Sequence, residues 1–498
     1  MVPLSTLVRR ASLDSGDLQV DPATDPPIAD VTHDSRSVRP GALFVAVPGH
    51  IVDGHDFLPD ALERGAQAIV GERPVTELRL PLNVPYIPVS NARRALADLA
   101  AAFYRWPTRR LTTVAVTGTK GKTSVAHLSA AALGNDETSL ISTITNALHR
   151  GREETTPSAL DIQRIAREAL EAGKRNLVLE ASAHGLVQER LRATDVDTAV
   201  FTNLSHDHLD YFQSTERYLD AKLRLFRQLK PGAAAVVNWD DPRADIVTCS
   251  TDARILTFGL TSDADVWAEV RHERVDGTSI VAHTPTGSMP MEIPWPGRIY
   301  VRNALAALGV GLAQGIPLNV LIDRLERVDR IEGRMERYPS HRGFTVVIDF
   351  AHSPDSLEQA LRTLKPDRGR LITVFGCGGD ADREKRPIMG ELSARLSDLT
   401  IVTGDNPKNE DPEAILDQIE RGIPHGARYE RIGHRGAAIE RAIERARPGD
   451  VVLIAGKGHE RALMFKDRLV PFNDRDYLVH LGVIDANGAC HDGATARV

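Results

Sequence analysis

The chain has few cysteines and no long apolar run. Only three cysteines occur among its 498 residues. They are Cys249, Cys377 and Cys490, and their odd number and wide spacing exclude a disulfide framework or a cysteine-based zinc site. No segment is apolar over the roughly 20 residues that a membrane-spanning helix needs, and no signal-peptide stretch follows Arg9 and Arg10. We therefore expect a cytoplasmic protein without a membrane partner.

An excess of positive charge is also absent. The 61 Lys and Arg residues are outnumbered by 68 Asp and Glu residues, which gives a formal net charge of -7. This balance leaves no broad basic surface for a polyanion, so nucleic acid is not expected as a partner. Hydrophobic residues make up 42% of the chain, enough for several cores, and the length exceeds what a single core organises.

Short apolar runs alternate with longer amphipathic stretches, which is typical of parallel sheets covered by helices. We expect an α/β fold of three domains: a smaller α/β domain over 1–108, a central P-loop-type domain with a mostly parallel sheet and helices over 109–332, and a Rossmann-like domain over 333–498. Turn signals at Asp276-Gly277 and Thr286-Gly287 predict hairpins between residues 263 and 294. The predicted buried strands include 114–117, 177–181, 199–202, 346–350, 371–375 and 451–455.

A glycine-rich loop lies between a predicted strand and a predicted helix. It consists of Gly118, Thr119, Lys120, Gly121, Lys122, Thr123 and Ser124. Glycines let backbone N–H groups surround phosphate oxygens, Lys122 reaches the β- and γ-phosphates, and Thr123 is placed to bind Mg²⁺. Val116 occupies the position of the first glycine of a full Walker A motif, so the loop is a shortened variant. It predicts a nucleotide-binding site, against the alternative of a chance glycine turn before a helix.

Two further polar clusters follow predicted strands, where open α/β sheets place their sites. They are Glu180 to His184 and Thr202 to His208. Carboxylate and imidazole groups there predict a Mg²⁺ site near the γ-phosphate. Taken alone, each of these residues also fits a plainer role in capping or loop packing, and Lys222, on a predicted helix over 216–229, fits a solvated helix face.

Ordered motifs extend along almost the whole chain. The N-terminal motifs are Asp34-Ser35-Arg36, Pro40-Gly41, Leu43 to Ala46, Gly49-His50 and Asp53-Gly54-His55. The C-terminal motifs are Gly333 to Glu336, Asp349 to Asp355, Gly376 to Asp380, Asp405 to Pro412 and Gly456 to Glu460. With the glycine loop, they resemble the Mur ligase family, most closely its tripeptide synthetases, which add the third residue of the peptide. Folylpolyglutamate synthetases share the shortened loop but lack the N-terminal domain.

The resemblance implies a role for each matching residue. The catalytic residues are Lys122, Glu180, His208 and Lys222. The UDP-binding residues are Ser35 and His50, and the residues that bind the muramoyl dipeptide are Thr155, Thr156, Ser182, Gln188 and Arg190. ATP is bound by Gly118 to Ser124, Asn303, Arg334 and His352, and Mg²⁺ by Thr123, Glu180, His208 and Lys222, the last as an N6-carboxylysine. The incoming amino acid is bound by Arg383, Asp405, Asn406, Pro407, Lys408, Gly456 and Glu460.

The predicted amino-acid pocket departs from the family pattern. Relatives that use meso-diaminopimelate have arginines where this chain has Ala381 and Lys408. An arginine binds a carboxylate through two hydrogen bonds, whereas lysine offers a point charge. Arg383 is a candidate to replace the missing arginine. A diamino acid is therefore expected, and both meso-diaminopimelate and L-lysine stay open.

The implied reaction is ATP-dependent formation of an amide bond in peptidoglycan precursor synthesis. The γ-phosphate passes to a carboxylate of UDP-N-acetylmuramoyl-L-alanyl-D-glutamate, and the amine then attacks the acyl phosphate. Such an enzyme positions its substrates and neutralises phosphate charge, here with Mg²⁺ and Lys122. The alternatives are a related ligase of a specialised-metabolite pathway, a folylpolyglutamate synthetase and a nucleotide-dependent switch without ligation. A monomer is expected.

Overall fold

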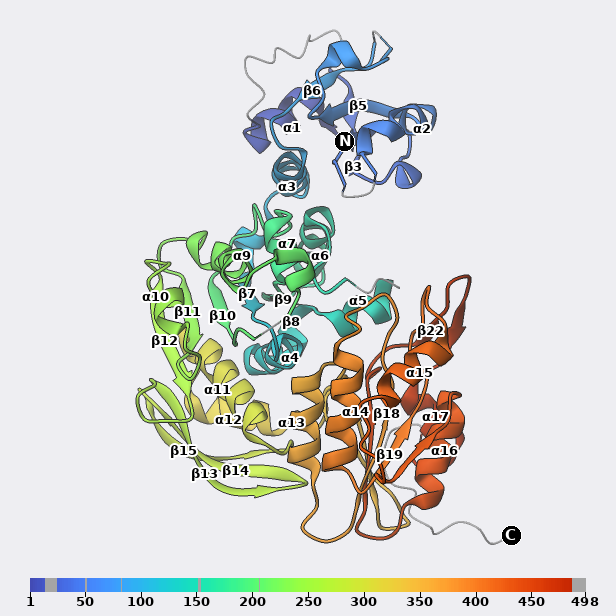
Figure 1. Cartoon of the computed structure of the whole chain (residues 1–498). Helices are drawn as coiled ribbons and strands as arrows, with labels where there is room; N and C mark the ends of the chain where they lie inside the picture. Colours follow the sequence, from blue (N-terminus) through green and yellow to red (C-terminus); the bar gives the residue numbers. More distant parts are fainter. Residues whose placement is uncertain (14–24, 50–51, 82, 151–153, 206, 486–498) are drawn as a thin grey trace, which may run out of the picture. The chain divides into compact units, whose positions relative to one another are not determined.

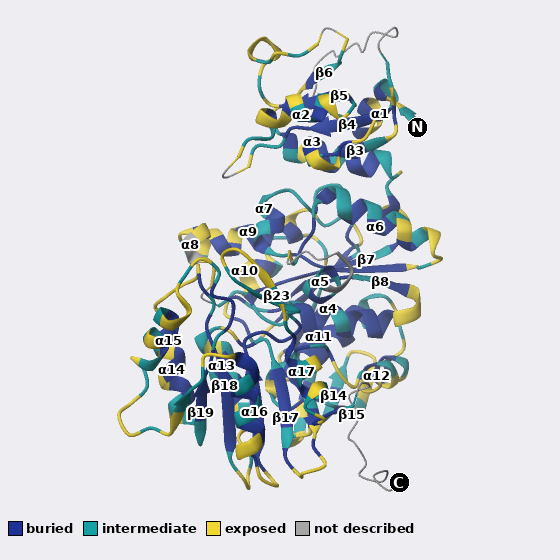
Figure 2. Cartoon of the chain, turned by 90° about the vertical axis from the view of Figure 1, so that its right-hand side faces the viewer, coloured by how far each residue is buried: buried dark blue, intermediate teal, exposed yellow. Residues whose placement is uncertain are grey.

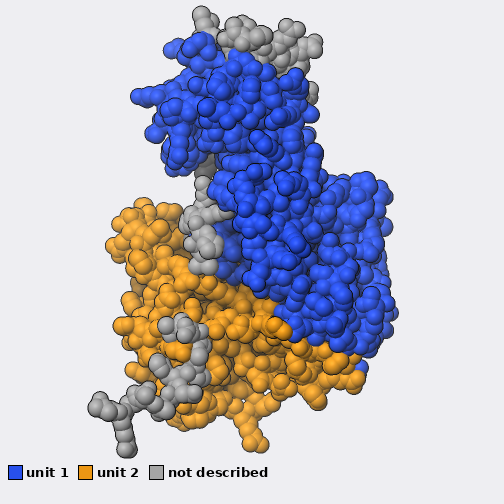
Figure 3. All heavy atoms as spheres, turned by 180° about the vertical axis from the view of Figure 1, so that it is seen from behind, with its two compact units in different colours: residues 1–269, 282–289, 302–325 blue, residues 270–281, 290–301, 326–498 orange. Residues whose placement is uncertain are grey.

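The computed structural model describes residues 1–13, 25–49, 52–81, 83–150, 154–205 and 207–485. The chain forms two compact units, which Figure 3 shows in different colours. Unit 1 consists of Met1–Glu269, Ala282–Met289 and Arg302–Leu325, and unit 2 of Val270–Val281, Pro290–Val301 and Glu326–Val498. Among the described helices, none combines the length and the apolar character needed to cross a bilayer.

The first part of unit 1 is a small parallel sheet with helices on both faces. Its strands β3 (Asp30–Thr32), β4 (Ala42–Val45), β5 (Ala66–Gly71) and β6 (Tyr86–Pro88) pair in chain order. Alternate residues of a strand point to opposite faces. Leu43 and Val70 therefore pack with α1 (Leu4–Ala11) and α3 (Ala92–Phe103), whereas Phe44 and Ile69 pack with α2 (Leu58–Glu63). A short pair, β1 (Val2–Pro3) and β2 (Pro27–Ile28), completes this part.

A second, nine-stranded sheet has the order β15-β14-β13-β12-β11-β10-β7-β9-β8 (Figure 1). Neighbouring strands from β13 to β8 are parallel. The strands are β7 (Thr112–Thr117), β8 (Thr138–Ile141), β9 (Asn176–Glu180), β10 (Thr198–Phe201), β11 (Ala234–Asn238), β12 (Arg254–Gly259), β13 (Val266–Arg274), β14 (Gly277–Thr284) and β15 (Gly287–Ile293). Because β9 and β10 flank β7 on opposite sides, the carboxyl end of β7 is a switch point of the kind at which ligands bind.

Helices cover this sheet. They are α4 (Lys122–Leu133), α5 (Thr143–Arg150), α6 (Ala159–Glu171), α7 (Ala183–Val187), α8 (Leu209–Phe212), α9 (Thr215–Arg227), α10 (Ala244–Thr248), α11 (Arg298–Ala313) and α12 (Leu318–Glu326). Apolar residues of α6, α9 and α10 share one core with β7, β9, β10 and β11. The strands of this core are buried along their length (Figure 2), as expected for a parallel sheet with both faces covered.

Unit 2 contains a six-stranded sheet in the order β16-β17-β21-β18-β19-β20. Strand β16 (Glu336–Pro339) is antiparallel to its neighbour, and the other pairs are parallel. The remaining strands are β17 (Thr345–Asp349), β18 (Leu371–Phe375), β19 (Leu399–Val402), β20 (Tyr429–Arg431), β21 (Val451–Ala455), β22 (Ala462–Met464) and β23 (Leu469–Pro471). The helices are α13 (Pro354–Leu364), α14 (Lys385–Leu396), α15 (Pro412–Glu420), α16 (Arg435–Arg445) and α17 (Asp474–His480).

The predicted α/β fold is confirmed by these sheets. The predicted hairpins are also confirmed, because β13, β14 and β15 turn at residues 275–276 and 285–286. The predicted domain ranges stay a prediction. The division into compact units cuts across the predicted range 109–332, since 270–281 and 290–301 belong to unit 2.

Candidate functional site

The glycine loop connects the carboxyl end of β7 to the start of α4. Gly118 and Gly121 have φ angles of 147° and 84°, in the region that favours glycine. A Cβ atom on Gly118 would lie 1.9 Å from Oγ1 of Thr202, and one on Gly121 would lie 2.8 Å from Oδ1 of Asn303. A side chain at either position would therefore clash with the polar residues around the loop.

The segment after β10 braces this loop. Oδ1 of Asn203 accepts a hydrogen bond from the backbone N–H of Lys120 at 2.9 Å, and its Nδ2 donates to the Lys120 carbonyl at 3.0 Å. Oγ1 of Thr202 donates to the same carbonyl at 2.7 Å. Nζ of Lys122 donates to the carbonyls of Gly118 and Thr119 at 3.0 and 2.8 Å. Lys122 thus lies over its own loop, where its charge suits a bound phosphate.

Thr123 and Glu180 meet beside the loop. Glu180 ends β9 and is 1% exposed. Its Oε2 accepts a hydrogen bond from Oγ1 of Thr123 at 3.1 Å, and its Oε1 accepts one from the backbone N–H of Thr143 at 2.8 Å. Such oxygens are the ligands that Mg²⁺ prefers. Within the described part of the chain, no group of three or more His, Cys, Asp and Glu side chains is arranged to hold a metal ion, so a cation here would need additional ligands such as phosphate and water.

Lys222 is buried against the same loop. It lies on α9, is 1% exposed, and its Nζ donates a hydrogen bond to the Gly118 carbonyl at 2.8 Å. The Nζ atom also lies 4.1 Å from the ring centroid of Tyr218. Burial, and secondly the charge of Lys122, lower the pKa of Lys222 well below its usual value. The neutral amine, which is the nucleophilic form, is therefore favoured at this position.

His208 lies among aromatic rings. Its ring centroid is 5.0 Å from that of His184 and 6.0 Å from that of Tyr218, which is one turn of α9 before Lys222. The backbone of His208 is left-handed, with φ of 53°, and the side chain is 48% exposed. Its role as a Mg²⁺ ligand stays a prediction.

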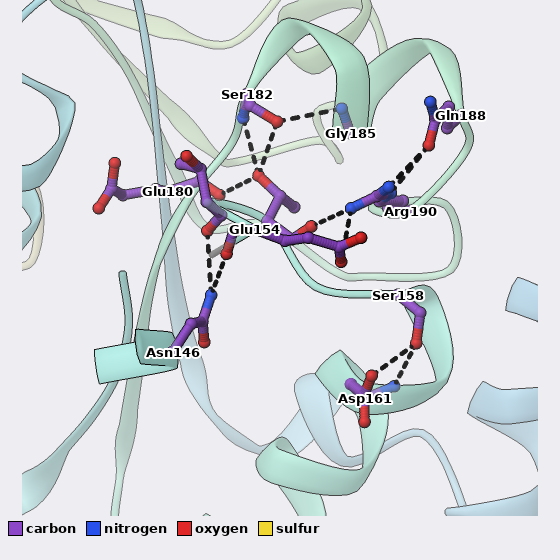
Figure 4. A network of polar contacts seen from close by, with 11 residues as sticks. Asn146, Glu154, Ser158, Asp161, Glu180, Ser182, Gly185, Gln188 and Arg190 are labelled. Atoms are coloured by element: carbon purple, nitrogen blue, oxygen red, sulfur yellow. Dashed lines mark hydrogen bonds and ion pairs between the residues drawn. The ribbon is translucent and has the colours of Figure 1, made fainter. Parts of the chain in front are cut away.

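Most residues predicted to bind the muramoyl dipeptide share one polar network (Figure 4). Oγ1 of Thr156 accepts a hydrogen bond from the backbone N–H of Ser182 at 2.9 Å and donates to the carbonyl of Glu180 at 2.8 Å. Oγ of Ser182 caps α7 by accepting from the N–H of Gly185 at 3.1 Å. Thr155 accepts at its Oγ1 from that of Thr143 at 3.1 Å. These hydroxyls therefore lie close to Glu180, the residue that the sequence analysis predicts to bind Mg²⁺.

Arg190 is held in the same network. Its Nε and Nη2 donate to Oε1 of Gln188 at 3.1 and 2.8 Å, and its Nη1 donates to the carbonyl of Thr156 (Figure 4). Nη1 also lies 3.2 Å from Oε2 of Glu154, whose side chain is 50% exposed. Arg190 thus already binds a carboxylate, the type of group that it is predicted to bind on the substrate. Glu154 belongs to no motif and was not predicted as a site residue.

The predicted UDP and ATP residues are distributed over both units. Ser35 is buried in unit 1, and His50 lies outside the described residues. Asn303, on α11 in unit 1, is buried beside Gly121. In unit 2, the guanidinium of Arg334 lies 4.7 Å from the ring centroid of Phe350, and the ring of His352 lies 4.6 Å from the same ring. Flat cationic and aromatic groups of this kind suit a purine or a phosphate.

Asp405, Asn406 and Glu460 come together at the carboxyl ends of β19 and β21. Nδ2 of Asn406 donates to Oε2 of Glu460 at 2.7 Å, and Oδ1 of Asp405 accepts from the N–H of Asn406 at 2.8 Å. Gly456, with φ of 112°, allows this approach, because a Cβ there would lie 2.8 Å from Oδ2 of Asp405. Lys457, which sequence reasoning did not single out although it lies inside the Gly456 to Glu460 motif, is buried among these residues.

Arg386 and Glu410, which were not predicted either, join the two loops of this pocket. Arg386 is fully buried, and its Nη1 and Nη2 donate to the two carboxylate oxygens of Glu410 at 3.0 and 2.9 Å. Nη2 also donates to the carbonyl of Gly378, and Glu410 accepts from the N–H of Asp380 at 2.7 Å. Hydrogen bonding to Arg386 lowers the pKa of Glu410 to about 2. The loop that follows β18 is therefore fixed beside the loop that follows β19.

Arg383 and Lys408 lie on these two loops. Nη2 of Arg383 is 3.1 Å from Oε2 of Glu410, and the Arg383 side chain is 66% exposed. Lys408 has a left-handed backbone, with φ of 50°, and its N–H donates to the carbonyl of Met464 at 2.9 Å. Their contact with a substrate carboxylate stays a prediction.

A cavity of about 100 Å³ in unit 2 has Asp405 and Pro407 on its wall. Its other lining is largely apolar and includes Leu416 of α15. Arg435, which also lines it, is buried and donates two hydrogen bonds of 2.7 Å to the buried carboxylate of Asp474.

Three family models match consecutive parts of the chain. The Mur ligase family catalytic domain matches residues 27–104, the Mur ligase middle domain matches 116–311, and the Mur ligase glutamate ligase domain matches 333–458. The chain belongs to the Mur ligase family. The predicted class of enzyme, an ATP-dependent amide ligase, is thereby confirmed.

Individual relatives cover nearly the whole chain. It is 42% identical over 464 residues to the UDP-N-acetylmuramoyl-L-alanyl-D-glutamate–2,6-diaminopimelate ligase of Geobacillus thermodenitrificans (strain NG80-2), with 91% of this chain and 94% of the relative covered. It is 41% identical over 482 residues to the UDP-N-acetylmuramyl-tripeptide synthetase of Roseiflexus sp. (strain RS-1), with the same coverage. A solved structure of a UDP-N-acetylmuramoyl-L-alanyl-D-glutamate–2,6-diaminopimelate ligase matches with a TM-score of 0.65 and 32% identity, and covers 91% of this chain and 94% of that chain. The predicted resemblance to the tripeptide synthetases is confirmed.

Proposed function

We propose that the protein joins 2,6-diaminopimelate to UDP-N-acetylmuramoyl-L-alanyl-D-glutamate in an ATP-dependent reaction. The observation that carries this proposal is the cluster of Asp405, Asn406 and Glu460, which offers carboxylate acceptors for an ammonium group, while the loops that follow β18 and β19 carry the cations Arg383 and Lys408. Relatives at about 40% identity are named for the same substrates. L-lysine lacks the distal carboxylate that Arg383 and Lys408 are proposed to bind.

The phosphate loop performs the first half of the reaction. Backbone N–H groups of the loop and Nζ of Lys122 offset the charge of the γ-phosphate as it moves to the substrate carboxylate. Arg190 and the hydroxyls of Thr156 and Ser182 hold the dipeptide so that its carboxylate faces that phosphate. The amine held at Glu460, after losing its extra proton, then attacks the acyl carbon of the acyl phosphate, so that the amide bond forms as the C–O bond breaks and inorganic phosphate leaves.

Thr123 and Glu180 fit a magnesium ion, because they supply a hydroxyl and a buried carboxylate 3.1 Å apart at the edge of the phosphate loop. A bound Mg²⁺ would neutralise phosphate charge during transfer. His208 is proposed as a further ligand. Lys222 is proposed to be carbamylated, since burial favours the neutral, reactive form of its amine, which lies beside the Gly118 carbonyl. The carbamate would provide an anion for a second Mg²⁺.

We also propose that the protein works as a cytoplasmic monomer. The requirement for ATP fits the cytoplasm.

The proposal is tested by phosphate release from ATP in the presence of UDP-N-acetylmuramoyl-L-alanyl-D-glutamate. 2,6-Diaminopimelate, L-lysine, L-ornithine and glycine are supplied separately, and the product is identified by mass. We expect turnover with diaminopimelate and much less with the others. Equal turnover with L-lysine, or turnover only with a different acid acceptor, would contradict the proposed substrate pair.

A further inference from the structure

Lys457 is a charged side chain at the centre of the predicted amino-acid site, yet it is inaccessible to solvent. It follows Gly456 at the carboxyl end of β21, and its side chain is 0% exposed. Its Nζ donates to Oδ1 of Asn406 at 3.0 Å, to Oε2 of Glu460 at 2.7 Å and to the carbonyl of Ala462 at 2.7 Å. The three donor positions of the ammonium are therefore occupied by protein acceptors, so Lys457 has no hydrogen left for a substrate.

These bonds decide which way the amide of Asn406 points. Oδ1 accepts from Nζ of Lys457 and also from the backbone N–H of Met464 at 3.0 Å. The amide oxygen is thus fixed between two donors, and Nδ2 must lie on the opposite side, where one of its hydrogens reaches Glu460. Among the described residues, the second hydrogen of Nδ2 has no acceptor. It is available to a carboxylate of a bound amino acid.

The same lysine opposes protonation of Glu460. Oε2 of Glu460 accepts from both Lys457 and Asn406, whereas Oε1 has no hydrogen-bond partner among the described residues. Burial raises the pKa of Glu460, and the charge of Asp405 raises it further, whereas Lys457 opposes both effects. Arg435 adds positive charge nearby. Oε1 is thus an open acceptor on a carboxyl group beside two cations, which suits an ammonium group.

We propose that Lys457 is a positioning residue for the incoming amino acid, which it serves by fixing the Asn406 amide and the Glu460 carboxylate in one orientation. This inference rests on the proposed function, since it assumes that Asn406 and Glu460 bind the amino acid. A bond network of this kind gives the site a donor and an acceptor side by side before any ligand arrives. An α-amino acid carries the complementary carboxylate and ammonium groups.

The glycines on both sides of Lys457 show how closely this segment is packed. A Cβ on Gly456 would lie 2.8 Å from Oδ2 of Asp405, and one on Gly458, with φ of 52°, would lie 2.9 Å from the Gly333 carbonyl. The backbone of Lys457 is therefore held in place independently of its side chain. A change of the side chain alone is expected to disturb the bond network more than the path of the chain.

The test is Lys457→Met in the full-length enzyme, with initial rates of phosphate release measured against each substrate. Methionine has a similar length but donates no hydrogen bond. KM for 2,6-diaminopimelate is expected to rise roughly tenfold to a hundredfold, while KM for ATP and for the UDP-linked dipeptide changes by less than about twofold. In the variant, Glu460 is expected to take up a proton at higher pH, so the rise of this KM on acidification should begin at higher pH than in the native enzyme.

Arg370→Met is a matched control for loss of a partly buried charge in unit 2. Arg370 precedes β18 at the amino end of the sheet and pairs with buried Asp450 at 2.6 Å. The Arg370→Met substitution should lower the temperature of unfolding without changing KM for the amino acid. If Lys457→Met does not fold, Lys457→Gln, which keeps a donor for Asn406, takes its place.

A double-mutant cycle of Lys457→Met with Glu460→Gln separates positioning from general destabilisation. If Lys457 acts through Glu460, its effect on the amino-acid KM should largely disappear in the Glu460→Gln background. The positioning role would be overturned if the two substitutions had additive effects on the amino-acid KM, or if this KM were unchanged in Lys457→Met. A native enzyme that shows no turnover dependent on diaminopimelate would instead overturn the proposed function, and this inference with it.

Discussion

Replacement of Arg383 by alanine is expected to weaken selection of 2,6-diaminopimelate and to leave the fold intact. The side chain is 66% exposed, and its ion partner Glu410 keeps both of its hydrogen bonds to buried Arg386 when Arg383 is removed. An exposed ion pair contributes about 0–1 kcal/mol to the free energy of unfolding. The melting temperature should therefore fall by no more than a few degrees.

The effect on catalysis should be larger and specific to one substrate. Diaminopimelate differs from L-lysine by a second carboxylate, and Ala381 provides no group to bind it. If Arg383 binds that carboxylate, its removal costs about 1.5–3 kcal/mol, the usual contribution of a hydrogen bond to a charged group. The ratio of kcat/KM for diaminopimelate to kcat/KM for L-lysine should then fall about 10-fold to 150-fold.

The assay is phosphate release at saturating ATP and UDP-linked dipeptide, with diaminopimelate or L-lysine as the varied substrate. Arg395→Ala is the matched control, because Arg395 is 53% exposed in unit 2 and lies 3.9 Å from Glu358. The control should keep the native ratio. A ratio in Arg383→Ala within about threefold of the native value would show that Arg383 does not bind the distal carboxylate.

Three further outcomes are expected. Lys122→Ala should abolish acyl-phosphate formation with little change in thermal unfolding, because the residue lies on a loop and offsets phosphate charge; retained ATP turnover would refute this role. Lys222→Ala should be nearly inactive and partly rescued by short carboxylic acids, whereas full activity without rescue would exclude a catalytic carbamate. Asp474→Ala should lower the free energy of unfolding in denaturant titrations by about 3–5 kcal/mol, because it leaves the guanidinium of Arg435 buried without its anion. The double variant Arg435→Met/Asp474→Leu should lose less free energy of unfolding than Asp474→Ala. An equal loss in the two variants would contradict the buried-pair explanation.

Much of the fold was predictable because its pattern is local. The strands β7, β17 and β21 are short, apolar and bounded by turn residues, and β13 to β15 alternate around glycine turns, so each element is encoded in its own segment. The glycine loop was likewise predictable, since strand, loop and helix are consecutive in the chain. The partition into compact units was not, because it depends on which hairpin residues pack with which sheet.

The hydrogen-bond network around the predicted amino-acid site could not be predicted from the sequence. Arg386 and Glu410 are 24 residues apart, and Lys457 is 51 residues from Asn406. Nothing in the sequence around a lysine or glutamate distinguishes a buried, paired side chain from a solvated one. Only the packing of β18, β19 and β21 beside one another brings these residues within hydrogen-bond distance.

The bracing of the glycine loop by Thr202 and Asn203 determines when the loop loses its conformational freedom. Since both side chains already hold the Lys120 peptide, and Gly118 and Gly121 already have their left-handed backbones, the entropy of ordering is lost as the protein folds. A nucleotide then binds to a loop that is already ordered, so no binding free energy is spent on ordering the chain. Asn203 should consequently influence nucleotide affinity through the stiffness of the loop.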